Sequence, residues 1–282
     1  MRLRLLLYAM VVALMLMSST LCIADVDWSF KTELNFKNPP VDMAVSRDAQ
    51  WLYVLTEDGH LLVYTFDHQL KGKIPVGIEF EKIISGPSRD IIYLLSRKGN
   101  KIRILEANPS QQIDISGSPY KGAIDAPVVI TEFTDFQCPY CAKLGEIFNR
   151  LLKQYPEKLK IVYKSYPLAN HRYAWKAATN AMAAHQKGKF WEFHDRLFEN
   201  HKTLDDNKIM EIRKTLGFDT PEFDAIMGSP QVRSQVALDR SEGQRLGVRG
   251  TPTVFINGKR LKDKSLEGLQ AAIEKELNTL RK

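Results

Sequence analysis

The chain has 282 residues, 44% of them hydrophobic, and is therefore long enough for a sizeable core and two modest domains. Its formal net charge is +7, but lysines and arginines are interleaved with acidic residues instead of forming a basic stripe. This pattern gives no support to nucleic-acid binding, and the ordinary composition without low-complexity tracts excludes a disordered chain.

The first 24 residues have the pattern of an export signal. Arg2 and Arg4 form a short basic start, and residues 5–17 follow without a charge. Residues 22–24 (CIA) place small side chains at the two positions that a signal peptidase recognises. We therefore predict that residues 1–24 are a cleaved signal peptide and that the protein is periplasmic or otherwise exported. An uncleaved anchor is the alternative, since the uncharged stretch is about long enough to span a bilayer.

Residues 38–110 contain an internal repeat with a period of 40. Residues 51–56 (WLYVLT) align without a gap on residues 91–96 (IIYLLS), and Gly59 falls on Gly99. Each unit consists of short strand-like stretches separated by turn residues. This pattern resembles single blades of a β-propeller, a likeness that carries no function with it.

The repeats predict a small all-β domain over residues 25–110. Two units cannot close a propeller, which needs about four blades, and open sheets leave edges that proteins cover or pair. Two explanations stay open. The domain either associates with a second copy of itself to form a homo-oligomer, or it packs only against the C-terminal half of its own chain.

A polar stretch rich in Gly and Pro at residues 106–122 marks a domain boundary, after which strand and helix signals alternate. A buried strand is predicted first, and the helix after it begins at Cys138 with Pro139 at the favoured first position. The predicted order is strand (128–134), helix (from 138), strand (161–166), helical stretch (171–246), strand (253–256), hairpin turn (257–258) and a last helix from residue 265.

Beyond the signal segment the chain has two cysteines, Cys138 and Cys141, in a Cys-Pro-Tyr-Cys motif. Structural zinc needs four ligands and the chain has no second such pair, so a zinc site is disfavoured, whereas a soft cuprous ion stays possible. Because the dithiol follows a buried strand and opens a helix, a redox role is favoured. Backbone N–H groups and the helix dipole stabilise a thiolate at Cys138, and Cys141, one turn further on, can resolve a mixed disulfide.

The segment around the dithiol resembles the DsbA-like thioredoxin-fold family of thiol–disulfide oxidoreductases. Residues 131–141 (TEFTDFQCPYC) carry the resemblance, which covers about residues 117–282. Further matching segments are 122–128 (GAIDAPV), 166–168 (YPL), 177–178 (AA) and 250–258 (GTPTVFING). The resemblance implies an α/β thioredoxin fold over residues 111–282, with a helical insertion at about 168–246, preceded by the small all-β domain.

The resemblance also implies site residues. Pro252 is expected to follow a cis peptide bond in a loop facing the dithiol, with the backbone of Thr251 pairing with an extended substrate segment. Glu132 occupies the place of a buried acid that relays a proton to or from the second cysteine, although its pattern also fits a solvent-facing strand position. Pro139 and Tyr140 complete the predicted substrate-binding residues.

Other conspicuous residues are assigned structural roles. Asn170 and His171 are predicted to cap a helix. Lys164 fits either a charge near the dithiol or a solvated strand residue. Five aromatic residues are predicted to pack in a helical core rather than line a peptide groove: Trp175, Phe190, Trp191, Phe193 and Phe198.

Together these features predict an exported thiol–disulfide oxidoreductase that acts on protein or peptide thiols and disulfides. The direction, as an oxidase or as an isomerase or reductase, is left open, and a membrane or soluble redox partner is expected. The Cys138–Cys141 disulfide would be the redox group, with no bound cofactor and no metal. The alternative is a binding module whose β repeats hold a partner and whose dithiol binds a soft metal or has no catalytic role.

Overall fold

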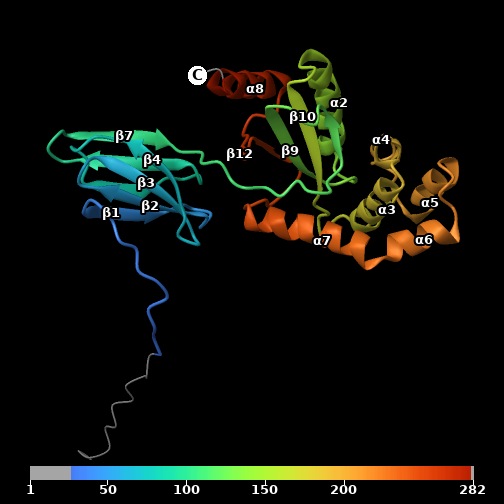
Figure 1. Ribbon diagram of the computed structural model, residues 1–282, viewed down its shortest axis with the longest axis horizontal. Coiled ribbons are helices and arrows are strands. Elements are labelled where there is room, and N and C mark those ends of the chain that lie inside the picture. Colours follow the sequence, from blue (N-terminus) through green and yellow to red (C-terminus); the bar gives the residue numbers. More distant parts are fainter. Residues whose placement is uncertain (1–26, 281–282) are drawn as a thin grey trace, which may run out of the picture. The chain divides into compact units, whose positions relative to one another are not determined.

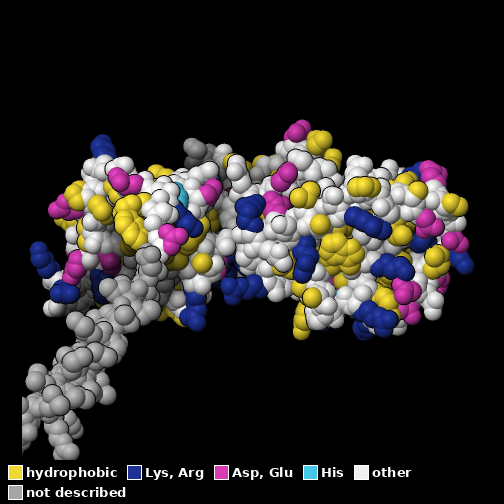
Figure 2. Space-filling view, turned by 90° about the horizontal axis from the view of Figure 1, so that it is seen from below, with side chains coloured by type: hydrophobic (Ala, Val, Ile, Leu, Met, Phe, Trp, Pro, Cys, Tyr) yellow, Lys and Arg dark blue, Asp and Glu magenta, His cyan; other side chains and the backbone are white. Residues whose placement is uncertain are grey.

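The computed structural model describes residues 27–280 (Figure 1). The predicted signal peptide, with Cys22, lies outside the described residues. Within 27–280, no helix has both the length and the apolar character needed to cross a bilayer. Lysine, arginine and acidic side chains are intermixed on the face drawn in Figure 2.

Seven antiparallel strands form two sheets in the N-terminal part (Figure 1). The second strand of each sheet, β2 or β6, coincides with one of the two aligned repeat segments. The internal repeat therefore corresponds to a repeated three-strand meander, extended by a fourth strand in the first unit. The strands are β1 (Pro40–Val45), β2 (Trp51–Thr56), β3 (His60–Thr65), β4 (Leu70–Pro75), β5 (Lys82–Ser85), β6 (Ile91–Ser96) and β7 (Lys101–Glu106).

The two sheets share one apolar core. Alternate side chains of β2 point into it, and Ile92 and Leu94 of β6 join them with less than 1% exposure. The sheets meet at β1 and β5, where the backbone N–H of Ile83 donates to Asp42 Oδ2 at 2.8 Å. The predicted all-β unit is confirmed.

Edge strands of these sheets expose apolar side chains. Met43 on β1 is 60% exposed, and Ile102 and Ile104 on β7 are 65% and 66% exposed. An exposed edge strand with apolar side chains is a surface that another chain can pair with. This observation agrees with the homo-oligomer hypothesis for residues 25–110.

We expect the protein without residues 1–24 to self-associate at micromolar concentration. Replacing Ile102 and Ile104 by lysine should shift the mass measured by light scattering to that of a monomer, because charges on an edge strand oppose edge pairing. Ile124 and Leu238 are comparably exposed and lie outside these two sheets, so changing them to lysine serves as the control. A wild-type protein that is a clean monomer would contradict the hypothesis.

The C-terminal part is built on a five-stranded mixed sheet of order β12-β11-β9-β10-β8. Its centre is the parallel pair β9 and β10, and the other neighbours are antiparallel. The short β8 was not predicted, because three residues are too few to show an alternating pattern. The strands are β8 (Tyr120–Gly122), β9 (Val128–Thr134), β10 (Leu159–Ser165), β11 (Thr253–Ile256) and β12 (Lys259–Arg260).

Helices α2 (Pro139–Gln154) and α8 (Leu266–Leu280) cover one face of this sheet (Figure 1). Val128 and Ile130 of β9 pack against them. Because side chains alternate along a strand, Glu132 lies on the same face, beneath α2. The alternation of side chains along β9 therefore determines that the Glu132 carboxyl group lies beneath α2.

A helical insertion joins β10 to β11, as predicted. Thr220 and Ser229 cap two of its helices by accepting hydrogen bonds from Phe223 and Val232, and each cap is followed by a proline at the first helical position. The insertion consists of α3 (Ala174–Gln186), α4 (Phe190–Glu199), α5 (Asp206–Thr215), α6 (Pro221–Gly228) and α7 (Pro230–Arg245).

Two structural predictions in the insertion were wrong. Asn170 and His171 do not cap a helix, because α3 begins three residues later with Tyr173 at its cap position. Trp175 is 41% exposed, since the buried face of α3 is formed by alanines and Trp175 lies beside Lys176 on the other face. The other four aromatic residues pack in or against the core as predicted: Phe190, Trp191, Phe193 and Phe198.

Candidate active site

The dithiol lies at the start of α2. Cys138 is the N-cap residue and Pro139 the first helical residue, so the backbone N–H groups of Tyr140 and Cys141 act on the leading sulfur. Both cysteines are free thiols, and they are 4% and 0% exposed. Tyr140 is 68% exposed, and with Pro139 it forms the rim of the site.

The environment of Cys138 favours its thiolate. A hydrogen bond from the Cys141 thiol, an interaction with Thr251, and the N–H groups of Cys141 and Tyr140 lower the pKa of Cys138 to about 5, although burial opposes this. A thiol with this pKa is ionised at neutral pH and is therefore a ready nucleophile and a good leaving group.

The environment of Cys141 has the opposite effect. Burial raises the pKa of Cys141 far above its ordinary value, and the hydrogen bond to Cys138 and the charge of Glu132 add to this. Cys141 therefore keeps its proton and donates it toward Cys138. To react, this sulfur needs a base beside it.

The loop before β11 faces the dithiol. The Thr251–Pro252 peptide bond is cis, as expected, and the Sγ of Cys138 lies 3.4 Å from the carbonyl oxygen of Thr251. Both loop residues are partly exposed. The structure thus brings together Cys138 and Thr251, which are 113 residues apart in the chain.

Glu132 lies inside the protein and not on a solvent-facing strand surface. It is 5% exposed, and its Oε1 has no hydrogen-bond partner in the described part of the chain. Burial raises the pKa of Glu132 to about 8. The carboxyl group is therefore protonated at neutral pH and able to give or take a proton near it.

The raised pKa of Glu132 predicts how the folding stability depends on pH. The unfolded chain releases the Glu132 proton above about pH 4.5, whereas the folded chain holds it to about pH 8, so stability falls as the pH rises between these values. Glu132→Gln should remove this slope, on the order of 1.4 kcal/mol per pH unit. Thermal unfolding of the disulfide form from pH 4 to 9 measures it.

Glu146→Gln, on the exposed side of α2, is the matched control and should keep the wild-type slope. Parallel curves for wild type and Glu132→Gln would mean that Glu132 titrates normally in the folded protein.

A cavity of about 690 Å³ extends from the surface to Glu132 and Cys141. Trp191, His194 and Phe198 of α4 form part of its wall, so the two aromatic residues assigned to the core also line this cavity. Burial lowers the pKa of His194, whose Nδ1 lies 2.7 Å from Asp195 Oδ1. The cavity is large enough for water to reach the buried carboxyl group.

Asp135 organises the active-site turn, a role that the sequence analysis missed. Its Oδ1 accepts from the backbone N–H of Gln137, and its Oδ2 accepts from that of Leu168 at 2.8 Å and lies 2.9 Å from His171 Nδ1. His171 therefore supports the turn and is not a helix cap. An acid three residues before the first cysteine is the only sequence signal that could have indicated this.

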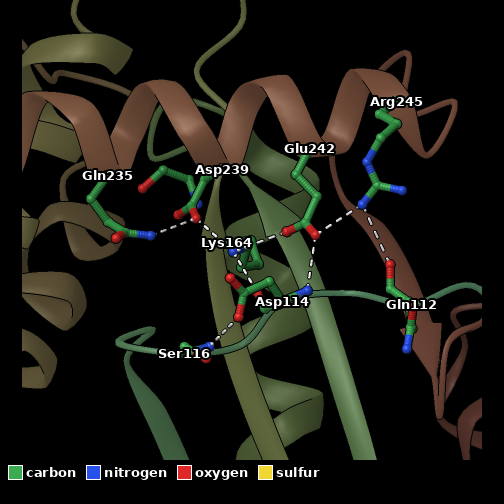
Figure 3. Close-up of polar contacts among 9 residues, drawn as sticks. Gln112, Asp114, Ser116, Lys164, Gln235, Asp239, Glu242 and Arg245 are labelled. Carbon is green, nitrogen blue, oxygen red and sulfur yellow. Dashed lines mark hydrogen bonds and ion pairs between the residues drawn. The ribbon is translucent and has the colours of Figure 1, made fainter.

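Lys164 belongs to a buried ion-pair network and matches neither sequence expectation (Figure 3). Its side chain is 4% exposed, and its Nζ lies 2.7 Å from Asp239 and 3.1 Å from Glu242, both on α7. Nζ also donates to the carbonyl of Asp114 at 2.8 Å. Although burial opposes it, these carboxylates raise the pKa of Lys164. The network joins β10, α7 and the segment before β8.

Known proteins are similar to the C-terminal part of the chain. Residues 115–275 match the family model described as Thioredoxin. The protein named probable disulfide bond formation protein D of Bacillus cereus is 30% identical over 167 residues, which are 55% of this chain and 77% of that protein. The solved structure of BdbD from Bacillus subtilis, oxidised, has a TM-score of 0.52 and 27% identity, and covers 60% of this chain and 97% of that one.

A second group of similar proteins carries a different name. The protein named Na(+)/H(+) antiporter NhaA 3 of Salinispora tropica is 32% identical over 163 residues, or 57% of this chain. The chain spans about a quarter of that protein's length. The family model begins at residue 115, and the comparisons give no support to the propeller likeness of the preceding sheets.

Proposed function

Because the chain belongs to the thioredoxin family, we propose that it is an exported thiol–disulfide oxidoreductase that oxidises client thiols through Cys138 and Cys141. The observation that carries this proposal is the position of Cys138 at the N-cap of α2, beside Cys141 and the Thr251 loop, where hydrogen bonds lower its pKa. A stabilised thiolate favours the reduced form of the pair, so the disulfide form accepts electrons readily. The similarity to a protein named for disulfide bond formation supports the same direction.

The reaction has two exchanges. A client thiolate attacks Sγ of Cys138, the Cys138–Cys141 bond breaks, and Cys141 leaves as a thiolate that takes the proton of Glu132. A second client thiolate then attacks the client sulfur, and Cys138 leaves as a stable thiolate. Two electrons pass from the client dithiol to the pair, and of the two client protons one ends on Cys141 and one enters solvent.

Glu132 and its cavity support the proton transfer. The carboxyl group lies beneath α2 with a pKa of about 8, so it can protonate Cys141 and be reprotonated by water in the cavity. In the reverse direction the carboxylate removes the Cys141 proton when this sulfur attacks a mixed disulfide. The chemistry needs the sulfur pair alone and no bound cofactor.

The proposed clients are extended polypeptide segments. The Thr251 carbonyl beside Cys138 offers a backbone pairing site, and the exposed Pro139 and Tyr140 follow Cys138 at the start of α2. The basic and apolar pattern of residues 1–24 supports export of the protein. Outside the cytoplasm, conditions are oxidising and client proteins form disulfides as they fold. A membrane or soluble redox partner would reoxidise the pair.

Thiolate titration and the reduction potential test the proposal. The absorbance of reduced protein at 240 nm should titrate near pH 5, and Cys138→Ser should remove this step. At pH 7, two units above the pKa, the thiolate stabilises the reduced form by about 2.7 kcal/mol relative to a thiol that stays protonated. This corresponds to a reduction potential that is about 60 mV higher. A thiol that titrates near pH 9, or a pair that forms no disulfide, would overturn the proposal.

The exposed edge strands favour isomerisation as a second candidate function. Dithiols held apart in an oligomer can act around one misfolded client. Rescue of a scrambled disulfide protein that is lost in the Ile102 and Ile104 lysine variant would support isomerisation, whereas unchanged rescue would reject it. Binding of a cuprous ion without turnover would instead support the binding module.

A further inference from the structure

Each repeat unit of the N-terminal sheets carries a Ser-Arg-Asp turn within three residues of the start of its second strand. In the first turn Ser46 Oγ donates to Asp48 Oδ1 at 2.7 Å, and in the second Ser88 Oγ donates to Asp90 Oδ1 at 2.7 Å. The same local hydrogen bond thus holds an arginine in the middle of both turns. The proposed disulfide chemistry uses neither arginine.

Both turns line one cleft of about 610 Å³, within the single compact unit to which the described residues from 38 onward belong. Its remaining wall comes from the loop at Gly247 and the segment at β12. Six basic side chains line this cleft with two aspartates, and Glu106 beside it lies 3.1 Å from Lys262 Nζ, which leaves an excess of three positive charges. The charged lining residues are Arg47, Arg89, Arg249, Arg260, Lys262, Lys264, Asp48 and Asp90.

The positive charges are only partly compensated inside the protein. Arg89 Nε lies 3.2 Å from Asp48 Oδ2, but both Nη atoms of Arg89 are buried without a hydrogen-bond partner among the described residues. Burial, together with the charges of Arg89 and Arg249, lowers the pKa of Arg260. Buried donors without acceptors are costly, so the cleft is suited to an anion.

The cleft adjoins the loop that faces the dithiol. Arg249 precedes Thr251 by two residues, which is about 7 Å of extended chain at most. The Thr251 carbonyl lies 3.4 Å from Cys138 Sγ. A polypeptide paired with Thr251 can therefore place a side chain in the cleft a few residues from its reacting cysteine.

We propose that this basic cleft binds aspartate or glutamate side chains of the client, so that the protein prefers cysteines with acidic neighbours. Guanidinium groups match carboxylates in charge and in planar geometry. The β repeats thereby act in client selection. This inference rests on the proposed oxidation of client thiols, and it adds the class of client.

Two matched peptides test the inference. Each has two central cysteines, flanked within four residues by glutamates in one peptide and by glutamines in the other. The oxidised protein without residues 1–24 should oxidise the glutamate peptide about fivefold faster in 50 mM salt. In 0.5 M salt the rates should converge, because screening shortens the range of charge attraction to a few ångströms.

Arg47→Glu should reduce the glutamate-to-glutamine rate ratio to about one, whereas Arg97→Glu, an equal charge change at a 90% exposed arginine outside the cleft, should keep the ratio near five. Equal rates for both peptides with wild type, or equal losses in the two variants, would overturn the inference and leave the proposed function intact. Oxidation of neither peptide would count against the proposed function itself.

Discussion

Cys141→Ala is expected to convert the protein into a covalent trap. The reduced variant still has the Cys138 thiolate, which attacks a disulfide-bonded peptide and forms a mixed disulfide. Without the second sulfur nothing in the site resolves this bond, so a one-to-one adduct should accumulate and turnover should fall on the order of a thousandfold. Cys138→Ser should lose turnover equally but form no adduct, and mass spectrometry separates the two results.

The same variant tests why Cys138 ionises. The hydrogen bond from Cys141 is the largest cause of its lowered pKa. Cys141→Ala removes the donor and should raise the pKa of Cys138, whereas Cys141→Ser keeps a hydroxyl donor and should raise it less. Identical titrations of both variants and wild type would assign the lowered pKa to the helix N-terminus and Thr251 instead of the Cys141 hydrogen bond.

Lys164→Met is expected to cost about 3–5 kcal/mol of folding free energy. The change leaves Asp239, which is 1% exposed, without its cation and removes a partner of Glu242 (Figure 3). A buried carboxylate without a cation is strongly unfavourable. Urea unfolding at pH 7 measures the loss as a lower midpoint with an unchanged slope.

Two variants make this result specific. Lys158→Met changes an exposed lysine beside the same strand and should cost less than about 0.5 kcal/mol. Adding Asp239→Asn and Glu242→Gln to Lys164→Met removes the uncompensated charges and should restore at least half of the loss. If Lys164→Met is as stable as Lys158→Met, the network does not support the fold.

Local patterns in the sequence were enough for the order of most elements and for the place of the dithiol at a helix start. A proline after Cys138 and a buried strand before it place the dithiol at a helix start, and helix geometry alone gives the two sulfurs different environments. The 40-residue repeat likewise predicted the strands of the N-terminal sheets. Such signals depend on neighbours in sequence, so they are visible without a structure.

Only the tertiary structure decided the contacts between distant segments. Ser165 and Asp239 are 74 residues apart in the chain but are joined by a hydrogen bond. The sequence around either residue does not show that α7 packs on β10 and makes Lys164 a buried cation. Asp135 and the basic cleft depend in the same way on segments that meet only in the folded chain. Strand alternation offered two faces for Glu132, and the packing of α2 and α8 determined that its face is buried. Burial, and with it the pKa of a charged group, is a property of the assembled layers rather than of the sequence pattern.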